Sequence, residues 1–376
     1  MSWPVRPLLV TGCCGVLLAT AWQTDAAMGA EPSDAVMKVH AVQATFNDSP
    51  FEYRMTLLSK REGFKVYRLT YPSPIKTAHA ANNTVPADYY VPDGIEPGDT
   101  KRPAVICLHI LAGKFELVDI VCSALARRGI PAIMFKLPYY GERSSDPQGR
   151  KEIASDPALF VRAIRQGLQD VRRTIDVLSS RAEVDSKHIG ITGISLGGIV
   201  AAAAASDEPR LKRAVLVLAG GDLVTIINHA RETRSMRRVL DQLSASKRAE
   251  FEKTISTVDP LHLAAGLRKR ATAGKVLMIN ASRDEVIPPA CTKKLAASLG
   301  IADKVIWLDG LGHYTALAEL SRTVRLTTEF FAKDLPSDVK PYRTNGAAQT
   351  PLQTTAQLLQ QVAMLLTVEP PAGRCH

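Results

Sequence analysis

The sequence predicts an α/β fold, with a mostly parallel sheet that is covered by helices on both faces. Apolar, strand-like runs alternate with amphipathic helical stretches over most of the chain, and such repeated units form parallel sheets. The strand-like runs are almost wholly apolar, as expected for strands buried on both faces. Hydrophobic residues make up 46% and charged residues 22% of the 376 residues, which permits a large core.

The first thirty residues have the order of a secretory signal peptide. One positive charge up to Arg6 precedes an apolar run, Pro7–Trp22, and small residues follow as far as Ala30. The apolar run is short and is broken by Gly and Thr, which disfavours a stable membrane span. We therefore expect signal cleavage, no membrane span in the mature chain, and a secreted or periplasmic protein.

Residues 31–63 are expected to be a polar segment that leads into one domain, residues 64–335. Phe64–Tyr71 and Val85–Val91 alternate in polarity and predict an antiparallel hairpin at the start of the sheet. The buried strands that follow are expected at Pro103–Ile110, Ile130–Leu137, His188–Ile194, Leu211–Leu218, Lys275–Asn280 and Lys304–Leu308. Helices are expected at Glu116–Arg128, Pro157–Ser179, Ser195–Ser206, Ala290–Leu299 and Tyr314–Lys333.

Two segments depart from this alternation. Asp222–Ala273 is charged, helical in pattern and free of strand signals, so we interpret it as a small helical lid inserted into the domain. The C-terminal tail, residues 336–376, is rich in Gln, Thr and Pro, and its role is not predicted.

Charge and cysteine content exclude several classes of function. The net charge is +10, but the basic residues are dispersed and are not interleaved with aromatic residues, which argues against nucleic acid as a partner. Cys107, Cys122, Cys291 and Cys375 would remain after signal cleavage, too few for a disulfide scaffold in a chain of this length. Neither a CxxC nor an HExxH spacing is found, so no metal is predicted.

The segment Gly193–Gly197 reads GISLG and matches the pattern GxSxG. It follows a predicted buried strand and opens a predicted helix, the context in which this pattern holds a nucleophilic serine on a tight turn. Glycines on either side remove side chains that would clash in such a turn. We interpret Ser195 as a nucleophile; the alternative is a serine that only caps the following helix.

A nucleophilic serine needs a histidine as base and an acid that orients the histidine, in the chain order serine, acid, histidine. Asp284 and His313 follow the last two predicted strands and lie at the same sheet edge as Ser195. Glu285, Asp222 and Asp309 are alternatives for the acid. The other histidines are less well placed for the base: His40, His79, His109, His188, His229 and His262.

An acyl-transfer site also needs backbone N–H donors for the developing oxyanion. The N–H of Leu196, at the start of the helix, is one expected donor. The second should come from the loop that follows the Pro103–Ile110 strand, from Leu111 or from Ile110. His109 in this loop is expected to be structural.

Four segments resemble the α/β-hydrolase superfamily, and in it the bacterial dienelactone hydrolases and acetyl-xylan-esterase-like proteins. They are GISLGG at Gly193–Gly198, SRDEVIP at Ser282–Pro288, GLGHY at Gly310–Tyr314 and LPYYGERSS at Leu137–Ser145. The resemblance covers about Phe64–Lys333. It implies an eight-stranded sheet, a covalent acyl-enzyme and no cofactor, and its motifs assign Ser195, Asp284 and His313 as a catalytic triad.

Two departures from that pattern bear on the substrate. Dienelactone hydrolases usually carry a cysteine nucleophile, so Ser195 favours a simple ester over a lactone. The usual His-Gly pair of the oxyanion loop reads His109-Ile110 here. We expect a serine esterase that acts on a small-molecule ester, with acetylated carbohydrates among the candidates.

Two other functions are compatible with the same fold. A serine peptidase of the prolyl-oligopeptidase type would usually add a β-propeller, for which the sequence leaves no room before Phe64. A catalytically inactive binding module would not require all three triad positions to be filled. The acyl group, the alcohol and the oligomeric state are not predicted.

Overall fold

The computed structural model describes residues 37–342, except 46–48, 97, 114, 145–152 and 154–155. The expected signal peptide and residues 343–376 of the tail lie outside the described residues. Within the described part of the chain, no helix is long and apolar enough to span a membrane.

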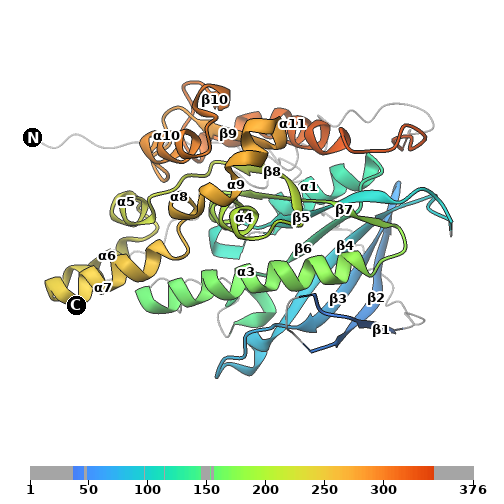
Figure 1. Ribbon diagram of the computed structural model, residues 1–376, viewed down its shortest axis with the longest axis horizontal. Coiled ribbons are helices and arrows are strands. Elements are labelled where there is room, and N and C mark those ends of the chain that lie inside the picture. Colours follow the sequence, from blue (N-terminus) through green and yellow to red (C-terminus); the bar gives the residue numbers. More distant parts are fainter. Residues whose placement is uncertain are drawn as a thin grey trace, which may run out of the picture. The chain divides into compact units, whose positions relative to one another are not determined.

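A ten-stranded sheet with the order β1-β2-β3-β4-β6-β5-β7-β8-β9-β10 forms the centre of the domain (Figure 1). Strands β5 to β10 pair in parallel, and β1, β2, β3, β4 and β6 pair antiparallel in that order. The strands are β1 (Lys38–Val42), β2 (Phe51–Arg61), β3 (Phe64–Pro72), β4 (Thr84–Pro92), β5 (Arg102–Leu108), β6 (Ala132–Phe135), β7 (Val184–Ile194), β8 (Leu211–Val217), β9 (Val276–Ala281) and β10 (Ile306–Leu308). The α/β fold class and the hairpin of β3 and β4 are confirmed.

The sheet has ten strands rather than the expected eight, because β1 and β2 lie in the segment that was expected only to lead into the domain. In β2 the buried side chains Phe51, Tyr53 and Met55 alternate with exposed charged ones. Only one face of this strand is covered, so its sequence is half polar and resembles a loop. The domain therefore begins near Lys38 and not at Phe64.

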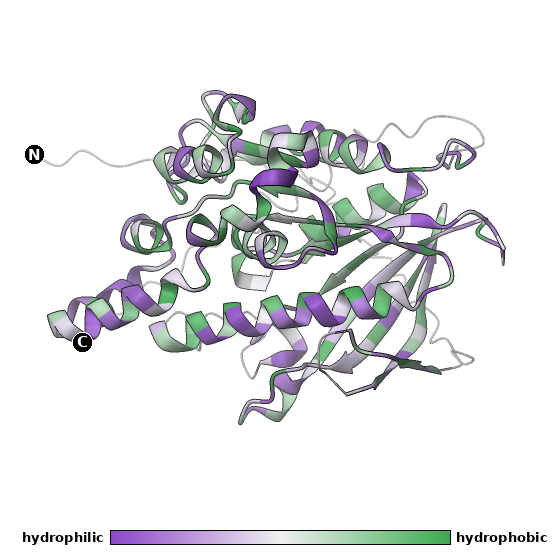
Figure 2. Cartoon of the chain, in the orientation of Figure 1, coloured by the Kyte–Doolittle hydropathy of each residue, from purple (hydrophilic) through white to green (hydrophobic). Residues whose placement is uncertain are grey.

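Helices cover the two faces of the sheet as expected. Alternate residues of β5 separate the faces: Val105 and Cys107 pack with α1 (Glu116–Arg127) and α11 (Leu320–Ala332). Ile106 and Leu108 pack with the opposite layer of helices. That layer contains α3 (Pro157–Ser179), α4 (Leu196–Asp207) and α10 (Pro289–Ser298). Polar and apolar bands alternate along α3, as one buried helix face requires (Figure 2).

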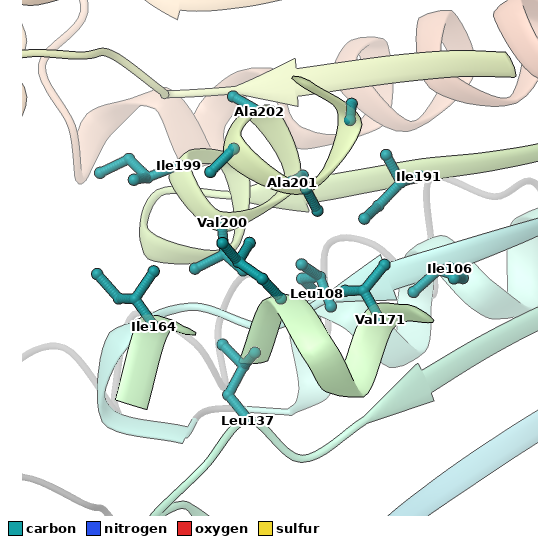
Figure 3. Packing of buried hydrophobic residues seen from close by; sticks show 14 of the residues in the cluster. Ile106, Leu108, Leu137, Ile164, Val171, Ile191, Ile199, Val200, Ala201 and Ala202 are labelled. Carbon is teal, nitrogen blue, oxygen red and sulfur yellow. The ribbon is translucent and has the colours of Figure 1, made fainter. Parts of the chain in front are cut away.

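Helix α4 is deeply buried in the domain. Its residues Ala201–Ala205 are almost completely buried between β7, β8 and α3. Alanine has no side chain beyond Cβ, so the helix axis can approach the sheet closely. Figure 3 shows Val200 and Ala201 of this helix in the core with Ile191, Leu108 and Val171 around them.

The segment expected as a lid is helical and free of strands. It contains α5 (Leu223–His229), α6 (Arg234–Asp241), α7 (Ala245–Ser256), α8 (Pro260–Leu263) and α9 (Ala265–Arg270). Buried side chains of α6 and α7, such as Met236 and Ile255, belong to the same core as α4. Asp259 accepts hydrogen bonds from the N–H groups of Asp222 (3.1 Å) and Leu223 (2.6 Å), which ties the residue before α8 to the beginning of the insertion.

A buried ion pair holds the loop that follows β6. Arg143 and Asp170 of α3 are 2.8 Å apart, and both side chains are fully shielded from solvent. Arg143 also donates to the carbonyl oxygens of Lys136 and Asn82, both at 2.8 Å. Burial raises the pKa of Asp170 although Arg143 lies against it. The pair therefore serves to fix the position of the loop more than to add net stability.

Replacing Arg143→Met should lower the free energy of unfolding by about 3–5 kcal/mol, because it leaves the Asp170 carboxylate buried and unpaired. Arg325→Met is the matched control: Arg325 and Glu329 form an ion pair whose side chains are 57% and 42% exposed. Such pairs contribute about 0–1 kcal/mol. Urea unfolding of the three proteins measures both effects, and equal losses in the two variants would contradict this account.

Candidate active site

Ser195 lies at the junction of β7 and α4 in a backbone conformation that few non-glycine residues adopt. Its φ is 56° and its ψ is −118°, which indicates a strained turn. The backbone N–H of Ser195 still donates to the carbonyl oxygen of Val217 on β8, at 2.9 Å. The chain thus leaves the sheet directly at the serine and begins a helix there, where free N–H groups carry partial positive charge.

The glycines on both sides of Ser195 are required by close backbone packing. A Cβ atom on Gly193 would lie less than 3.0 Å from the carbonyl oxygen of Gly197, a distance that real Cβ atoms do not show. A Cβ atom on Gly197 would lie equally close to the carbonyl oxygens of Leu108 and His109. The first turn of α4 therefore touches both the preceding turn and the end of β5.

His313 lies between Ser195 and Asp284 and contacts both. The Nε2 atom of His313 is 2.9 Å from Ser195 Oγ, and its Nδ1 atom is 2.8 Å from Asp284 Oδ2. An ionised carboxylate can only accept a hydrogen bond, so Nδ1 of His313 carries the proton and donates it to Asp284. The Nε2 atom then has a free lone pair, which can accept a hydrogen bond from the serine hydroxyl. The structure thus brings together the three residues that the sequence proposed as nucleophile, acid and base.

Asp284 is held rigidly in the loop after β9. Its side chain is 1% exposed, and its Oδ1 atom accepts the backbone N–H groups of Val286 (2.9 Å) and Ile287 (2.7 Å). These two donors satisfy the carboxylate in a buried position and fix its orientation toward His313. Both carboxylate oxygens face the imidazole, with Nδ1 of His313 3.0 Å from Oδ1 and 2.8 Å from Oδ2.

The alternative acids have other partners. Asp222 caps α5 through the N–H of Thr225 and pairs with Lys294. Burial acts to raise the pKa of Asp222, but the hydrogen bonds from Lys294 and Thr225 lower this pKa below its usual value. Glu285 accepts the backbone N–H of His313 at 2.8 Å and not its imidazole. Asp309 is exposed at the start of the loop, and both oxygens of Asp284 already face Nδ1.

Among the described histidines, the one that hydrogen-bonds with Ser195 Oγ is His313, and the others have the following positions. His188 is paired with Asp185 on an exposed part of β7, His40 stacks on Tyr53, and His79 contacts Tyr139. His229 and His262 are in the insertion, at the ends of short helices. His109 is the one whose position bears on the site.

His109 ties the loop after β5 to the loop after β6. Its Nδ1 atom lies 2.8 Å from the carbonyl oxygen of Ile110, and its Nε2 atom accepts the N–H of Leu137 at 3.0 Å. Both bonds are possible only for the neutral ring with its proton on Nδ1. Burial lowers the pKa of His109 to about 3, so the ring stays neutral. The structural role expected for His109 agrees with this geometry.

Two further features lie next to residues of this site. An apolar recess adjoins the turn at Ser195: Leu196 lines the recess together with Leu137, Ile164 and Val200, and these last three residues lie close together in Figure 3. The helical insertion also contacts the loop that carries His313, where the Tyr314 hydroxyl donates a hydrogen bond to Glu232. The sequence pattern gave no signal for this second contact, because Glu232 is one of many charged residues in the insertion. Among the described residues, no three His, Cys, Asp or Glu side chains gather to form a possible metal site.

Gly197→Ala should lower the free energy of unfolding by several kcal/mol, because the new Cβ must displace the backbone at the end of β5. Gly167→Ala is the matched control. A Cβ atom added at Gly167, in α3, would lie 3.5 Å from its nearest neighbour, the side chain of Leu137, which is an ordinary contact distance. In a helix the exchange of Gly for Ala is neutral or stabilising by up to about 1 kcal/mol. Thermal unfolding distinguishes the two variants, and a Gly197→Ala protein as stable as wild type would contradict the close approach.

His109 should make stability depend on pH. The unfolded ring has a pKa near 6.5, and the folded ring has a pKa of about 3. Between these values the unfolded state binds more protons, so this contribution is complete above pH 6.5 and is lost as the pH falls. Between pH 7 and pH 5, the free energy of unfolding should fall by about 2 kcal/mol more in the wild-type protein than in His109→Gln. Urea unfolding at several pH values checks this, and parallel curves for the two proteins would contradict it.

Comparison with known proteins agrees with this architecture. A model of the dienelactone hydrolase family matches residues 93–239, a range that includes Ser195 but ends before Asp284 and His313. A curated, uncharacterized protein of Mycobacterium tuberculosis is 30% identical over 131 residues, which are 34% of this chain and 31% of that protein. The chain thus spans about a third of the length of that relative. An uncharacterized protein of Escherichia coli is 24% identical over 210 residues, and the chain spans 60% of its length.

Solved structures extend the comparison to most of the chain. An acetyl xylan esterase from Paenibacillus sp. R4 has a TM-score of 0.55 at 20% identity, over 80% of this chain and 90% of that one. A hypothetical protein from Pseudomonas aeruginosa has a TM-score of 0.51 at 16% identity, over 74% of this chain and 99% of that one. The chain therefore has the α/β-hydrolase fold, and in its central part it is similar to the dienelactone hydrolase family.

Proposed function

We propose that the protein is a serine hydrolase that cleaves carboxylic esters through a covalent acyl-enzyme. One observation carries the proposal: the chain of hydrogen bonds from Ser195 Oγ through His313 to Asp284, built on a strained turn. A serine that only capped α4 would need neither the strain nor the histidine, and the Ser195 side chain makes no capping hydrogen bond.

The geometry supports the following first half-reaction. Ser195 Oγ attacks the ester carbonyl carbon while His313 Nε2 takes the hydroxyl proton. Asp284 then stabilises the imidazolium that forms, without becoming protonated itself. When the tetrahedral intermediate collapses, the C–O bond to the alcohol breaks, and His313 returns the proton to the leaving oxygen. The acyl group remains on Ser195.

Water completes the cycle by the same steps. His313 takes a proton from the water that attacks the acyl carbon, and Ser195 leaves with that proton while the acid is released. Both tetrahedral intermediates carry an oxyanion, for which we propose the N–H groups of Leu196 and Leu111 as donors. Their location fits this role, because α4 starts at Leu196 and the loop before Leu111 packs against the first turn of α4. Ile110 is the alternative to Leu111.

The substrate that we propose is a small-molecule ester. The apolar recess beside Leu196 is suited to its acyl group, and the helical insertion, which contacts the histidine loop through Glu232 and Tyr314, would act as a lid over the alcohol side. Since a structurally similar protein is an acetyl xylan esterase, acetylated carbohydrates are candidate substrates. Secretion or export to the periplasm, expected from residues 1–30, is part of the same proposal.

Ser195→Ala should abolish ester hydrolysis, with a loss in kcat on the order of 10⁴-fold or more, and should leave the fold intact. Ser206→Ala, at the other end of α4, is the control: its hydroxyl donates to the carbonyl oxygen of Ala202, and its loss should leave kcat unchanged. Assays with p-nitrophenyl esters of increasing acyl length, an acetylated sugar and peptide amides measure activity and substrate class. Full activity in Ser195→Ala would refute the assignment of Ser195 as the nucleophile. A preference for peptide amides over esters would show that the protein is a peptidase.

A further inference from the structure

The loops that carry Asp284 and His313 are joined by hydrogen bonds along their length. The N–H of Ser282 donates to the carbonyl oxygen of Leu308 at 3.1 Å, and the N–H of Arg283 donates to that of Leu311 at 2.8 Å. The N–H of Gly310 donates to Ser282 Oγ at 2.8 Å. These bonds align the two loops as far as Leu311. They leave the position of the next two residues, Gly312 and His313, to be fixed by other contacts.

The side chain of Glu285 supplies the contact that completes this alignment. Its Oε2 atom accepts the backbone N–H of His313 at 2.8 Å. The same oxygen occupies the space beside Gly312, where a Cβ atom would lie less than 3.0 Å from it. The N–H of Gly312 is held separately by Thr315 Oγ1 at 2.7 Å. The absence of a side chain at position 312 is thus what allows the carboxylate to reach the histidine backbone.

We propose that Glu285 is a positioning residue, which fixes the backbone of His313 while its neighbour Asp284 fixes the imidazole. Two adjacent carboxylates would then hold one histidine at two points, so that Nε2 stays within hydrogen-bond distance of Ser195. This inference rests on the proposed function of His313 as the general base. It goes further by giving a role to a residue that contacts neither Ser195 nor the imidazole.

The contact should act through its hydrogen bond and not through its charge. Glu285 is exposed, and solvent and salt weaken the effect of an exposed charge on a neighbouring group. A glutamine side chain has nearly the same shape and can also accept an N–H through its amide oxygen. Glutamine should therefore replace Glu285 with little loss, whereas alanine should release the loop.

The test compares Glu285→Gln, Glu285→Ala and the exposed-site control Glu329→Ala in the full chain. Two quantities are measured: the kinetics of p-nitrophenyl ester hydrolysis across pH, and the rate at which a fluorophosphonate inactivates Ser195. Glu285→Ala should lower kcat and the inactivation rate about 10- to 100-fold, with KM little changed, since a displacement of about 1 Å can have this effect. Glu285→Gln should recover most of that loss and keep the wild-type pH profile, and Glu329→Ala should match wild type.

Three results would overturn the inference: wild-type rates in Glu285→Ala, an equal loss in Glu285→Gln, or a shifted pH profile in Glu285→Gln. If Glu285→Ala does not fold, Gly312→Ala serves instead, because its Cβ displaces the carboxylate of Glu285. Wild-type rates in that variant would also overturn the inference.

Inactivation of the wild-type protein without hydrolysis of any ester would refute the proposed function, and the inactivation rates of the variants would still test the role of Glu285. A wild-type protein that is not inactivated would refute both.

Discussion

The close approach of the first turn of α4 to the end of β5 is the constraint on which the site depends. Backbone atoms of Gly193, Gly197 and Leu108 meet at distances that leave no space for any Cβ. This contact forces the strained conformation of Ser195 and places the serine at the N-terminal end of a helix. It also brings the end of β5 and the start of the loop after it, at Leu108 and His109, next to the turn that carries the serine. A strained residue persists only where the surrounding structure is rigid.

That rigidity comes from apolar packing on one side and from polar contacts on the other. The alanines of α4 allow the helix to lie deep in the core, so the strain at Ser195 is offset by extensive burial. The loops after β5 and β6 are held by groups with no charge exposed to water: neutral His109 joins the two loops, and the shielded pair of Arg143 and Asp170 fixes the loop after β6. Asp284 is held by backbone N–H groups in the same manner.

The sequence predicts those parts of the molecule that have a strong local pattern. The buried parallel strands and α3 are found within a few residues of their expected limits, because runs of apolar residues and helical periodicity report burial directly. Strands β1 and β2 were missed because one face of β2 is polar and exposed. Ser195, Asp284 and His313 could be proposed because each directly follows a strand or lies in the loop after one. The contacts of Glu285 with the His313 backbone, and of Tyr314 with Glu232, join residues far apart in sequence and have no local signal.

The most direct test of the account is to trap the acyl-enzyme and locate it. The protein would be mixed with a p-nitrophenyl ester, quenched in acid within the first turnovers, digested and examined by mass spectrometry. The account predicts that the mass of the acyl group appears on the peptide that contains Ser195, and that no adduct forms in Ser195→Ala. An acyl group on another residue, or hydrolysis of the ester by Ser195→Ala at the wild-type rate, would contradict it.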